Sequence, residues 1–238
     1  EFRRVLFRSA MCFPNEEDSL YILALCNSTP FNFLLALETP TLDYHEGPVG
    51  RVPVVKKNNS FNDKNIENLV CIAKKDWDSF ETSWSFKEFP WLFGELKAEN
   101  TILSNDNWES QCQTHIQTMK ELEEDNNRLF IKAYGLEGEL TADVPEEQIT
   151  LARADKVVDT KKLISYAIGC MMGRFSLDQQ GLVYAHSGNK DFNETVYSTF
   201  PADDDGILPL LDMDWEFEDD ITLRFEEFLR VVWDEKTL

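Results

Sequence analysis

Basic residues are scarce in this sequence: 23 Lys and Arg stand against 44 Asp and Glu, a formal net charge of -21 over 238 residues. A charge this negative argues against a simple basic nucleic-acid-binding domain. No apolar run approaches the roughly 20 residues of a membrane-spanning helix, so we do not expect a membrane protein. The sequence is nevertheless 42% hydrophobic and 12% aromatic, which excludes a wholly disordered acidic tail.

Local enzyme motifs are missing as well. The sequence has no GxxxxGKS phosphate loop, no GxGxxG dinucleotide loop and no GxSxG nucleophile elbow. Gly135 and Gly138 in YGLEGEL come nearest, and a helix end followed by a turn explains them better. Acidic pairs such as Asp219-Asp220 are expected by chance among 44 acids, and none is marked as an acid/base dyad. We therefore expect no catalytic and no cofactor-binding residue in this chain.

Cysteine and histidine are few and scattered. The cysteines are Cys12, Cys26, Cys71, Cys112 and Cys170, and the histidines are His45, His115 and His186. The odd cysteine count, the wide spacing and the lack of a signal peptide predict reduced thiols in a cytoplasm. We expect no metal site, since none of the ligand spacings of zinc sites occurs; a site assembled over long range is the alternative.

Residues 1–9 (EFRRVLFRS) match the translation of a common sequencing adapter over their whole length. We interpret them as an assembly scar, with a basic N-terminal arm as the alternative. On this interpretation the chain is a fragment of a longer protein. The helical pattern that runs to Leu238 without a stop signal suggests a truncated C-terminus too.

Apolar periodicity predicts a mainly α protein with minor β (α+β). The helices are expected at 18–26, 29–39, 63–80, 108–134, 161–172 and 218–233. We expect Thr29 to cap the second helix and Asp159-Thr160 the fifth. Further expectations are a short extended run at 52–55 and a loop-and-strand region after Gly173.

The individual apolar positions predict which side chains face inward. In the second helix these are Phe31, Phe33, Leu34, Leu35 and Leu37; in the third, Ile66, Leu69, Val70, Ala73 and Trp77; in the fifth, Leu163, Ile164, Ala167, Ile168 and Met171. Gly169 and Gly173 are four residues apart, so we expect another element to approach that helix closely, as part of the core rather than as a site.

An aromatic-rich segment occupies residues 80–93. Its rings favour a loop pinned to the core, and a base-stacking platform is the alternative. Such platforms pair aromatic with basic residues, whereas Lys87 is the only basic residue between Asp76 and Leu96.

Four blocks of this sequence resemble PglX, the adenine-specific DNA methyltransferase family of BREX phage-defence systems, in its C-terminal region. The blocks are Phe13-Pro14 with LYILALCNSTPFNFLLALETPTL and Gly47 to Pro53; AKKDWDSFETSWSF at Ala73 to Phe86; NNRLFIKAYGLEGEL at Asn126 to Leu140; and LISYAIGCMMGRFSLDQQGLVYA at Leu163 to Ala185. The first is similar to the family's target-recognition portion. The fourth is the strongest match.

The chain also departs from the family pattern. Thr29 stands where the family has Lys, and Gly47-Pro48-Val49 where it has Gly-Asp-Ile. The family's adenine-methylating Asn-Pro-Pro-Tyr motif and its S-adenosylmethionine loop are absent from this sequence. That motif holds a flipped adenine beside the methyl donor. The resemblance thus implies an S-adenosylmethionine-dependent DNA N6-adenine methyltransferase as the parent, and a fragment that is inactive by itself.

Residues 1–9 being interpreted as a scar, the resemblance implies this further organisation: end of the target-recognition region 10–57, helix and aromatic connector 58–107, and helical C-terminal region 108–238. It implies double-stranded DNA and other BREX proteins as partners of the parent. A free-standing acidic helical interaction protein, or a DNA mimic, is the alternative that the charge favours.

DNA contact, if it occurs within the chain, is expected in its least acidic part. Residues 11–75 hold 6 basic and 8 acidic residues, whereas residues 200–238 hold 3 and 13. Because phosphates are neutralised by local positive charge, Arg51, Lys56 and Lys57 are the expected contacts. Ordinary solvated side chains are the alternative.

Overall fold

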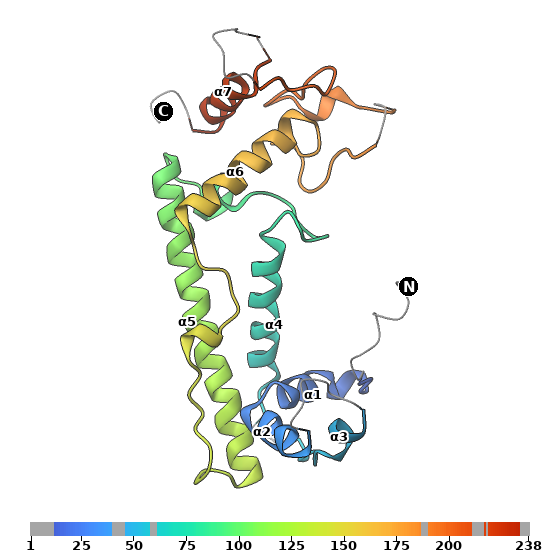
Figure 1. Ribbon diagram of the computed structural model, residues 1–238, viewed down its shortest axis with the longest axis vertical. Coiled ribbons are helices and arrows are strands. Elements are labelled where there is room, and N and C mark those ends of the chain that lie inside the picture. Colours follow the sequence, from blue (N-terminus) through green and yellow to red (C-terminus); the bar gives the residue numbers. More distant parts are fainter. Residues whose placement is uncertain are drawn as a thin grey trace. The chain divides into compact units, whose positions relative to one another are not determined.

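The computed structural model describes residues 12–39, 46–57, 61–186, 190–210, 217 and 219–233 (Figure 1). The helices are α1 (Ser19–Cys26), α2 (Thr29–Glu38), α3 (Glu46–Arg51), α4 (Asp63–Asp78), α5 (Thr101–Tyr134), α6 (Lys156–Met171) and α7 (Ile221–Trp233). Short 3-10 turns lie at Glu16–Asp18, Pro90–Leu92, Gly94–Leu96, Glu146–Gln148 and Glu194–Val196. The expected scar at residues 1–9 lies outside the described residues.

The described part of the chain contains no strand, so the mainly α prediction is confirmed and the minor β component is not found there. Residues 53–57 are irregular rather than paired. The reason lies in their carbonyls: the Tyr21 hydroxyl donates to the Val55 oxygen and the Tyr134 hydroxyl to the Pro53 oxygen, both at 2.5 Å. The carbonyls of Pro53 and Val55 thus accept hydrogen bonds from side-chain hydroxyls rather than from a neighbouring strand.

The chain divides into two compact units. Unit 1 comprises Glu1–Ala73 and His115–Thr150, and unit 2 comprises Lys74–Thr114 and Leu151–Leu238. Two of the three boundaries fall inside α4 and α5, and the third lies between Thr150 and Leu151. The expected segments 10–57, 58–107 and 108–238 concern the organisation of a parent protein and stay a prediction.

Unit 1 has a small core to which α1 and α2 contribute most of the buried side chains. Figure 1 shows α1, α2 and α3 grouped together. The buried side chains of this core are Tyr21, Ala24, Leu25, Phe31, Leu35, Val52, Ile66 and Phe130. Tyr21 packs on both Phe61 and Phe130, with ring centroids 5.0 and 5.6 Å apart.

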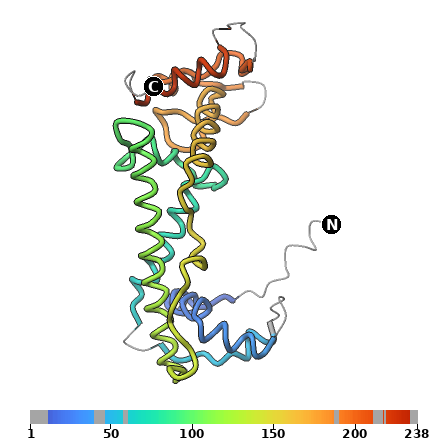
Figure 2. Tube along the Cα trace, turned by 60° about the vertical axis from the view of Figure 1, so that its left-hand side comes forward, coloured from blue at the N-terminus to red at the C-terminus, as the bar shows by residue number. Residues whose placement is uncertain are grey.

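Unit 2 has a larger, ring-rich core in which α6 contacts α7, as the tube in Figure 2 also shows. Tyr166 of α6 stacks on Phe175 at 5.1 Å, and Phe86 packs edge-on against both rings. Phe86, Phe89 and Trp91 are all buried. A loop pinned to the core by its rings is therefore the correct interpretation of residues 80–93, with Trp84 as an exception.

Two helices begin earlier than predicted because an upstream side chain caps them. The Asn100 side chain accepts a hydrogen bond from the Leu103 amide at 2.8 Å, and α5 begins at Thr101 rather than at 108. Asp155 accepts from the Val157 and Val158 amides, both at 2.9 Å, so it caps α6 instead of Asp159-Thr160.

The cap of α2 is Ser28 rather than Thr29. The Ser28 hydroxyl accepts from the Phe31 amide at 3.4 Å and donates to the Leu25 carbonyl at 2.7 Å. The two predicted glycine stops are correct: α5 and α6 end at Gly135 and Gly173, which have φ of +69° and +70°.

Several apolar side chains predicted to face inward are exposed instead: Phe33, Leu37, Val70, Trp77 and Ile164. In α2 the reason is geometric. Phe31 and Leu35 cover the core, and a shift of two residues, about 200° around a helix, turns Phe33 and Leu37 to the opposite side. A fully apolar helix does not reveal from its sequence which side will be covered.

Candidate functional site

Arg51, Lys56 and Lys57 lie within one short stretch of unit 1, but two of their charges are already paired. The Arg51 Nε lies 2.7 Å from a carboxylate oxygen of Glu38. The Lys57 ammonium lies 2.9 Å from Asp63. Lys56 is exposed and forms no ion pair with a described residue. Lys56 is therefore the most available of the three cations.

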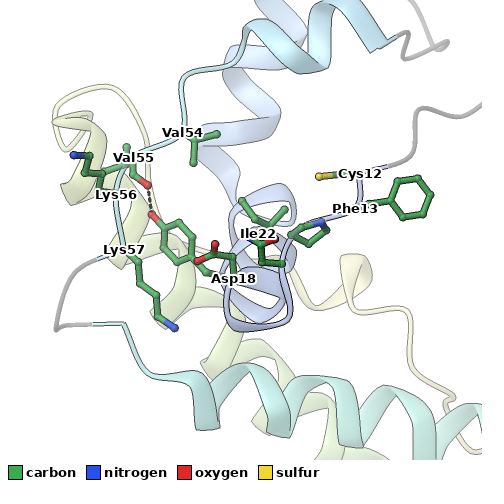
Figure 3. A pocket seen from close by; sticks show the side chains of 11 residues that line it. Cys12, Phe13, Asp18, Ile22, Val54, Val55, Lys56 and Lys57 are labelled. Carbon is green, nitrogen blue, oxygen red and sulfur yellow. Dashed lines mark hydrogen bonds between the residues drawn. The ribbon is translucent and has the colours of Figure 1, made fainter.

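An open groove of about 480 Å³ lies beside Lys56 and Lys57. It is lined by residues 12–15, by Asp18, Tyr21 and Ile22, and by residues 54–57. In Figure 3, Val54 lies on one side of it and Ile22 with Asp18 on another, and the dashed line marks the hydrogen bond to the Val55 carbonyl. The groove combines apolar walls with two ammonium groups and one carboxylate, which suits binding rather than covalent chemistry.

The first and third sequence blocks, nearly a hundred residues apart, meet in unit 1. The Asn126 side chain donates to the Ala24 carbonyl at 2.9 Å. Asn127, which is buried, accepts from the Thr29 amide at 2.9 Å and donates to the Ala142 carbonyl at 3.3 Å. Two side chains of α5 thus hold main-chain groups of α1 and of the start of α2 in place.

The second and fourth blocks meet in unit 2. Phe86 of the second block packs edge-on against Tyr166 and Phe175 of the fourth. The Ser165 hydroxyl donates to the Glu81 carboxylate at 3.5 Å. The Lys162 ammonium lies over the Phe80 ring, 4.5 Å from its centroid. These contacts fix the aromatic segment on α6 and on the loop that follows it.

The glycines of the fourth block serve packing, as the sequence predicts. A Cβ built on Gly169 would lie 2.5 Å from Cδ2 of Phe175, and one on Gly173 would lie 2.9 Å from the Phe192 ring. The Arg174 guanidinium lies beside the Phe175 ring, 5.5 Å from its centroid. The fourth block therefore forms part of the core of unit 2.

The buried thiols are chemically quiet. The pKa of Cys112 is raised to about 12, mainly by burial and in smaller part by nearby Asp76 and Asp159. The pKa of Cys170 is likewise raised to about 12, because burial outweighs the hydrogen bond with Tyr166 that lowers it. A thiol that stays protonated at neutral pH is a poor nucleophile and a poor metal ligand.

The described residues hold neither a cluster of metal ligands nor a single helix that could span a membrane. No three His, Cys, Asp or Glu side chains among them lie close enough together to hold a metal ion. Nor does any one helix there have the length and apolarity to cross a bilayer; the pair Glu16–Cys26 and Thr29–Glu38 reaches that threshold together but is bent by 73°.

Residues that the sequence did not single out carry much of this organisation. Asn127 lies in the third block, but the sequence did not mark it as a residue that joins two helices, because an asparagine in a long polar helix looks like a solvated residue. Trp84 was assigned to the ring-pinned loop, yet its side chain is fully exposed at 104%. Only the turn geometry separates it from its buried neighbours.

Comparison with known proteins gives two strong similarities. The chain is 38% identical, over 97% of its length, to the adenine-specific methyltransferase BrxX of Escherichia coli O9:H4 (strain HS), and 33% identical, over 95%, to the adenine-specific methyltransferase PglX of Lacticaseibacillus casei (strain Zhang). No protein-family profile matches it. The chain spans about a fifth of the length of each of these relatives, 20% and 19%. The resemblance drawn from the four blocks is confirmed.

Proposed function

We propose that this chain, homologous over nearly its whole length to part of the BrxX and PglX adenine-specific methyltransferases, serves target recognition and partner docking in such an enzyme. The parent would transfer a methyl group from S-adenosylmethionine to N6 of adenine in double-stranded DNA, in the cytoplasm, as part of BREX phage defence. Other BREX proteins would be the docked partners.

One observation carries the proposal: two methyltransferases from different bacteria match 97% and 95% of this chain. The two-unit organisation supports it, because both pairs of matching blocks meet in space and make specific contacts. Each pair of blocks therefore belongs to one folded unit, which short chance similarities would not explain.

We assign the chemistry to another part of the parent. Methylation of adenine requires a pocket that holds the flipped base beside the methyl donor. This sequence has neither Asn-Pro-Pro-Tyr nor a glycine-rich loop for S-adenosylmethionine, and its thiols Cys112 and Cys170 are held protonated. The chain would act by positioning DNA and partners.

Within unit 1, the groove and the stretch Arg51 to Lys57 are the proposed DNA contact. Lys56 supplies the available charge, while Arg51 and Lys57 would have to exchange Glu38 and Asp63 for phosphates. Surface ion pairs of this kind are worth little, about 0–1 kcal/mol, so such an exchange is inexpensive.

Deletion of the matched stretch from the E. coli relative tests the proposal. We expect the shortened enzyme to bind S-adenosylmethionine with unchanged affinity but to lose adenine methylation and much of its affinity for duplex DNA. A chimera carrying the present chain in that place should recover both activities. Loss of S-adenosylmethionine binding by a folded deletion variant, or methyl transfer by the 238-residue chain alone, contradicts the proposal.

The proposed DNA contact has its own test in the same chimera. Replacement of Arg51, Lys56 and Lys57 by Ala should weaken duplex binding and flatten its dependence on salt, because fewer counterions are released. Replacement of Lys64, Lys74 and Lys75 by Ala changes the net charge equally and serves as the control. Equal effects of the two triple variants would contradict the assignment of DNA contact to Arg51, Lys56 and Lys57.

The excess of acid favours a second function, that of an acidic interaction protein or DNA mimic. Residues 74–114 and 151–238, the two stretches of unit 2, hold 13 basic and 26 acidic residues. Unchanged methylation after the deletion, together with competition between the isolated chain and DNA for a DNA-binding protein, would favour this alternative.

A further inference from the structure

Two tryptophans stand at the ends of one closed turn in unit 2. Trp77 lies in the last turn of α4, and its side chain is 59% exposed. The side chain of Trp84 is 104% exposed. Between them, the Ser83 hydroxyl donates to the Asp78 carboxylate at 2.6 Å, and the Ser85 amide donates to the Ser83 hydroxyl at 3.1 Å. We call residues 77–84 the tryptophan turn. The hydrogen bond joins the residues next to each indole, so both rings project from one compact loop.

The tryptophan turn is held on α6. Lys162 lies over the Phe80 ring at 4.5 Å, and the Ser165 hydroxyl contacts the Glu81 carboxylate at 3.5 Å. Glu81 is half-buried, and burial raises its pKa while Ser165 and Arg174 lower it. The indoles are thus displayed on a fixed scaffold, which reduces the conformational entropy lost when they bind something.

Neither indole belongs to the buried core of unit 2 on which the turn is held. Phe86, Phe89 and Trp91 are 6%, 4% and 2% exposed, and they pin the segment. Single exposed apolar side chains are common on protein surfaces. The tryptophan turn differs from such single side chains, because it carries an exposed tryptophan at each end of eight residues. Tryptophan, with tyrosine and arginine, is among the residues most enriched at binding hot spots.

Charge indicates the class of the occupant. Unit 2 has twice as many acidic as basic residues, 26 against 13, so its field repels DNA phosphates and attracts cations. The turn itself carries the carboxylates of Asp78 and Glu81 between the two indoles. Indole faces bind guanidinium and ammonium groups, and tryptophan does so best among the aromatic residues.

We propose that the tryptophan turn is a docking surface for an arginine-bearing basic segment of a partner protein, with Trp77 and Trp84 receiving the cationic side chains. The inference rests on the proposed function, because it names the chemistry of a partner that the chain would dock. Arginine is favoured over lysine because its planar guanidinium stacks on aromatic rings.

A peptide titration of the 238-residue chain tests this inference. The probe is a Gly-Arg repeat peptide with four arginines, and the matched peptide carries citrulline, which has the same shape without the charge. We expect the arginine peptide alone to bind at about 0.3 M salt, where exposed charges separated by more than several ångströms are screened. The Trp77→Ala/Trp84→Ala variant should bind it about 5- to 30-fold more weakly, as two cation–π contacts would require.

The control variant is Ile207→Ala/Leu210→Ala, which removes exposed apolar side chains (66% and 74%) from the same unit and leaves the charge unchanged. Its affinity should equal that of the unaltered chain. Circular dichroism of all three proteins should agree, since none of these side chains is buried. No binding of the arginine peptide, or equal binding by the tryptophan variant, overturns the inference. Duplex or single-stranded DNA binding that the tryptophan variant loses would also overturn it, in favour of base stacking.

This titration and the deletion experiment fail separately. If the peptide binds but the deletion leaves methylation unchanged, the turn is a cation-binding surface and the proposed function is wrong. If the deletion behaves as expected but the peptide result is negative, only the role of the turn is lost.

Discussion

Unit 1 and unit 2 each bring together two sequence blocks that lie far apart in the chain, but they use different chemistry. In unit 1, Asn126 and Asn127 bond to main-chain groups of Ala24 and Thr29. In unit 2, Phe86 of the second block packs edge-on against Tyr166 and Phe175 of the fourth, and the Phe175 ring occupies the space where Gly169 has no side chain. The first arrangement tolerates changes of volume but not the loss of a polar atom. The second tolerates no added carbon.

The strongest test of this contrast is Gly169→Val. The new Cβ would lie 2.5 Å from Cδ2 of Phe175, and Phe175 is itself buried between Phe86 and Tyr166. We expect a loss of about 3 kcal/mol in the free energy of unfolding, measured by urea denaturation. Gly138→Ala is the control, because nothing lies within 4 Å of its Cβ.

Gly169→Ala sharpens the test through the sign of its effect. Helix propensity alone would make alanine more stable than glycine by about 1 kcal/mol. A measured destabilisation therefore identifies the contact with Phe175 as the cause. A stabilised Gly169→Ala variant would contradict the close packing of this helix.

The corresponding change in unit 1 is Asn127→Ala. It leaves the Thr29 amide and the Ala142 carbonyl without their partner, and we expect a loss of about 2 kcal/mol in the free energy of unfolding. Asn126→Ala removes the single bond to the Ala24 carbonyl, so its loss should be smaller. Equal losses for the two variants would mean that the second bond of Asn127 contributes nothing.

The smallest expected effect concerns Asp178 in unit 2. Thr199 donates to its carboxylate from the hydroxyl and, at 2.8 Å, from the amide, and these bonds lower the pKa of Asp178. Because the pKa of the folded state is below that of the unfolded state, the stabilisation is present above about pH 4 and is lost as the pH falls further.

Asp178→Asn removes this dependence on pH. Stability measured by urea denaturation from pH 6 downward should fall less steeply below about pH 4 in the variant than in the unaltered chain. The difference is expected to be slight, since the carboxylate is exposed. Parallel curves would show that the Thr199 bonds do not distinguish the folded from the unfolded state.

The helices and their glycine ends were predictable because those signals are local. Gly135 and Gly173 adopt positive φ, as a helix end requires. The 3.6-residue period located α4, α5, α6 and α7, and short apolar runs located α1 and α2. The starts of α5 and α6 were misjudged, since Asn100 and Asp155 look like ordinary loop residues until their bonds to the amides are seen.

The candidate site was less predictable. The sequence placed Arg51, Lys56 and Lys57 in its least acidic part, but it could not show that Glu38 and Asp63 pair with two of them. Nor could it show that Trp84 is exposed while Phe86 and Phe89, two and five residues later, are buried. Burial depends on which side of a turn faces the core, and no period exists in an irregular segment to reveal it.

The sequence by itself determined the helical class, the resemblance to an adenine-specific methyltransferase and the excess of acid. It did so because composition, period and short motifs are properties of neighbouring residues. Only the tertiary structure decided that the first block pairs with the third and the second with the fourth, that Ser28 caps α2, and that the tryptophan turn is presented to solvent. Contacts between residues 84 or 98 positions apart depend on the packing of the whole chain, which no local pattern records.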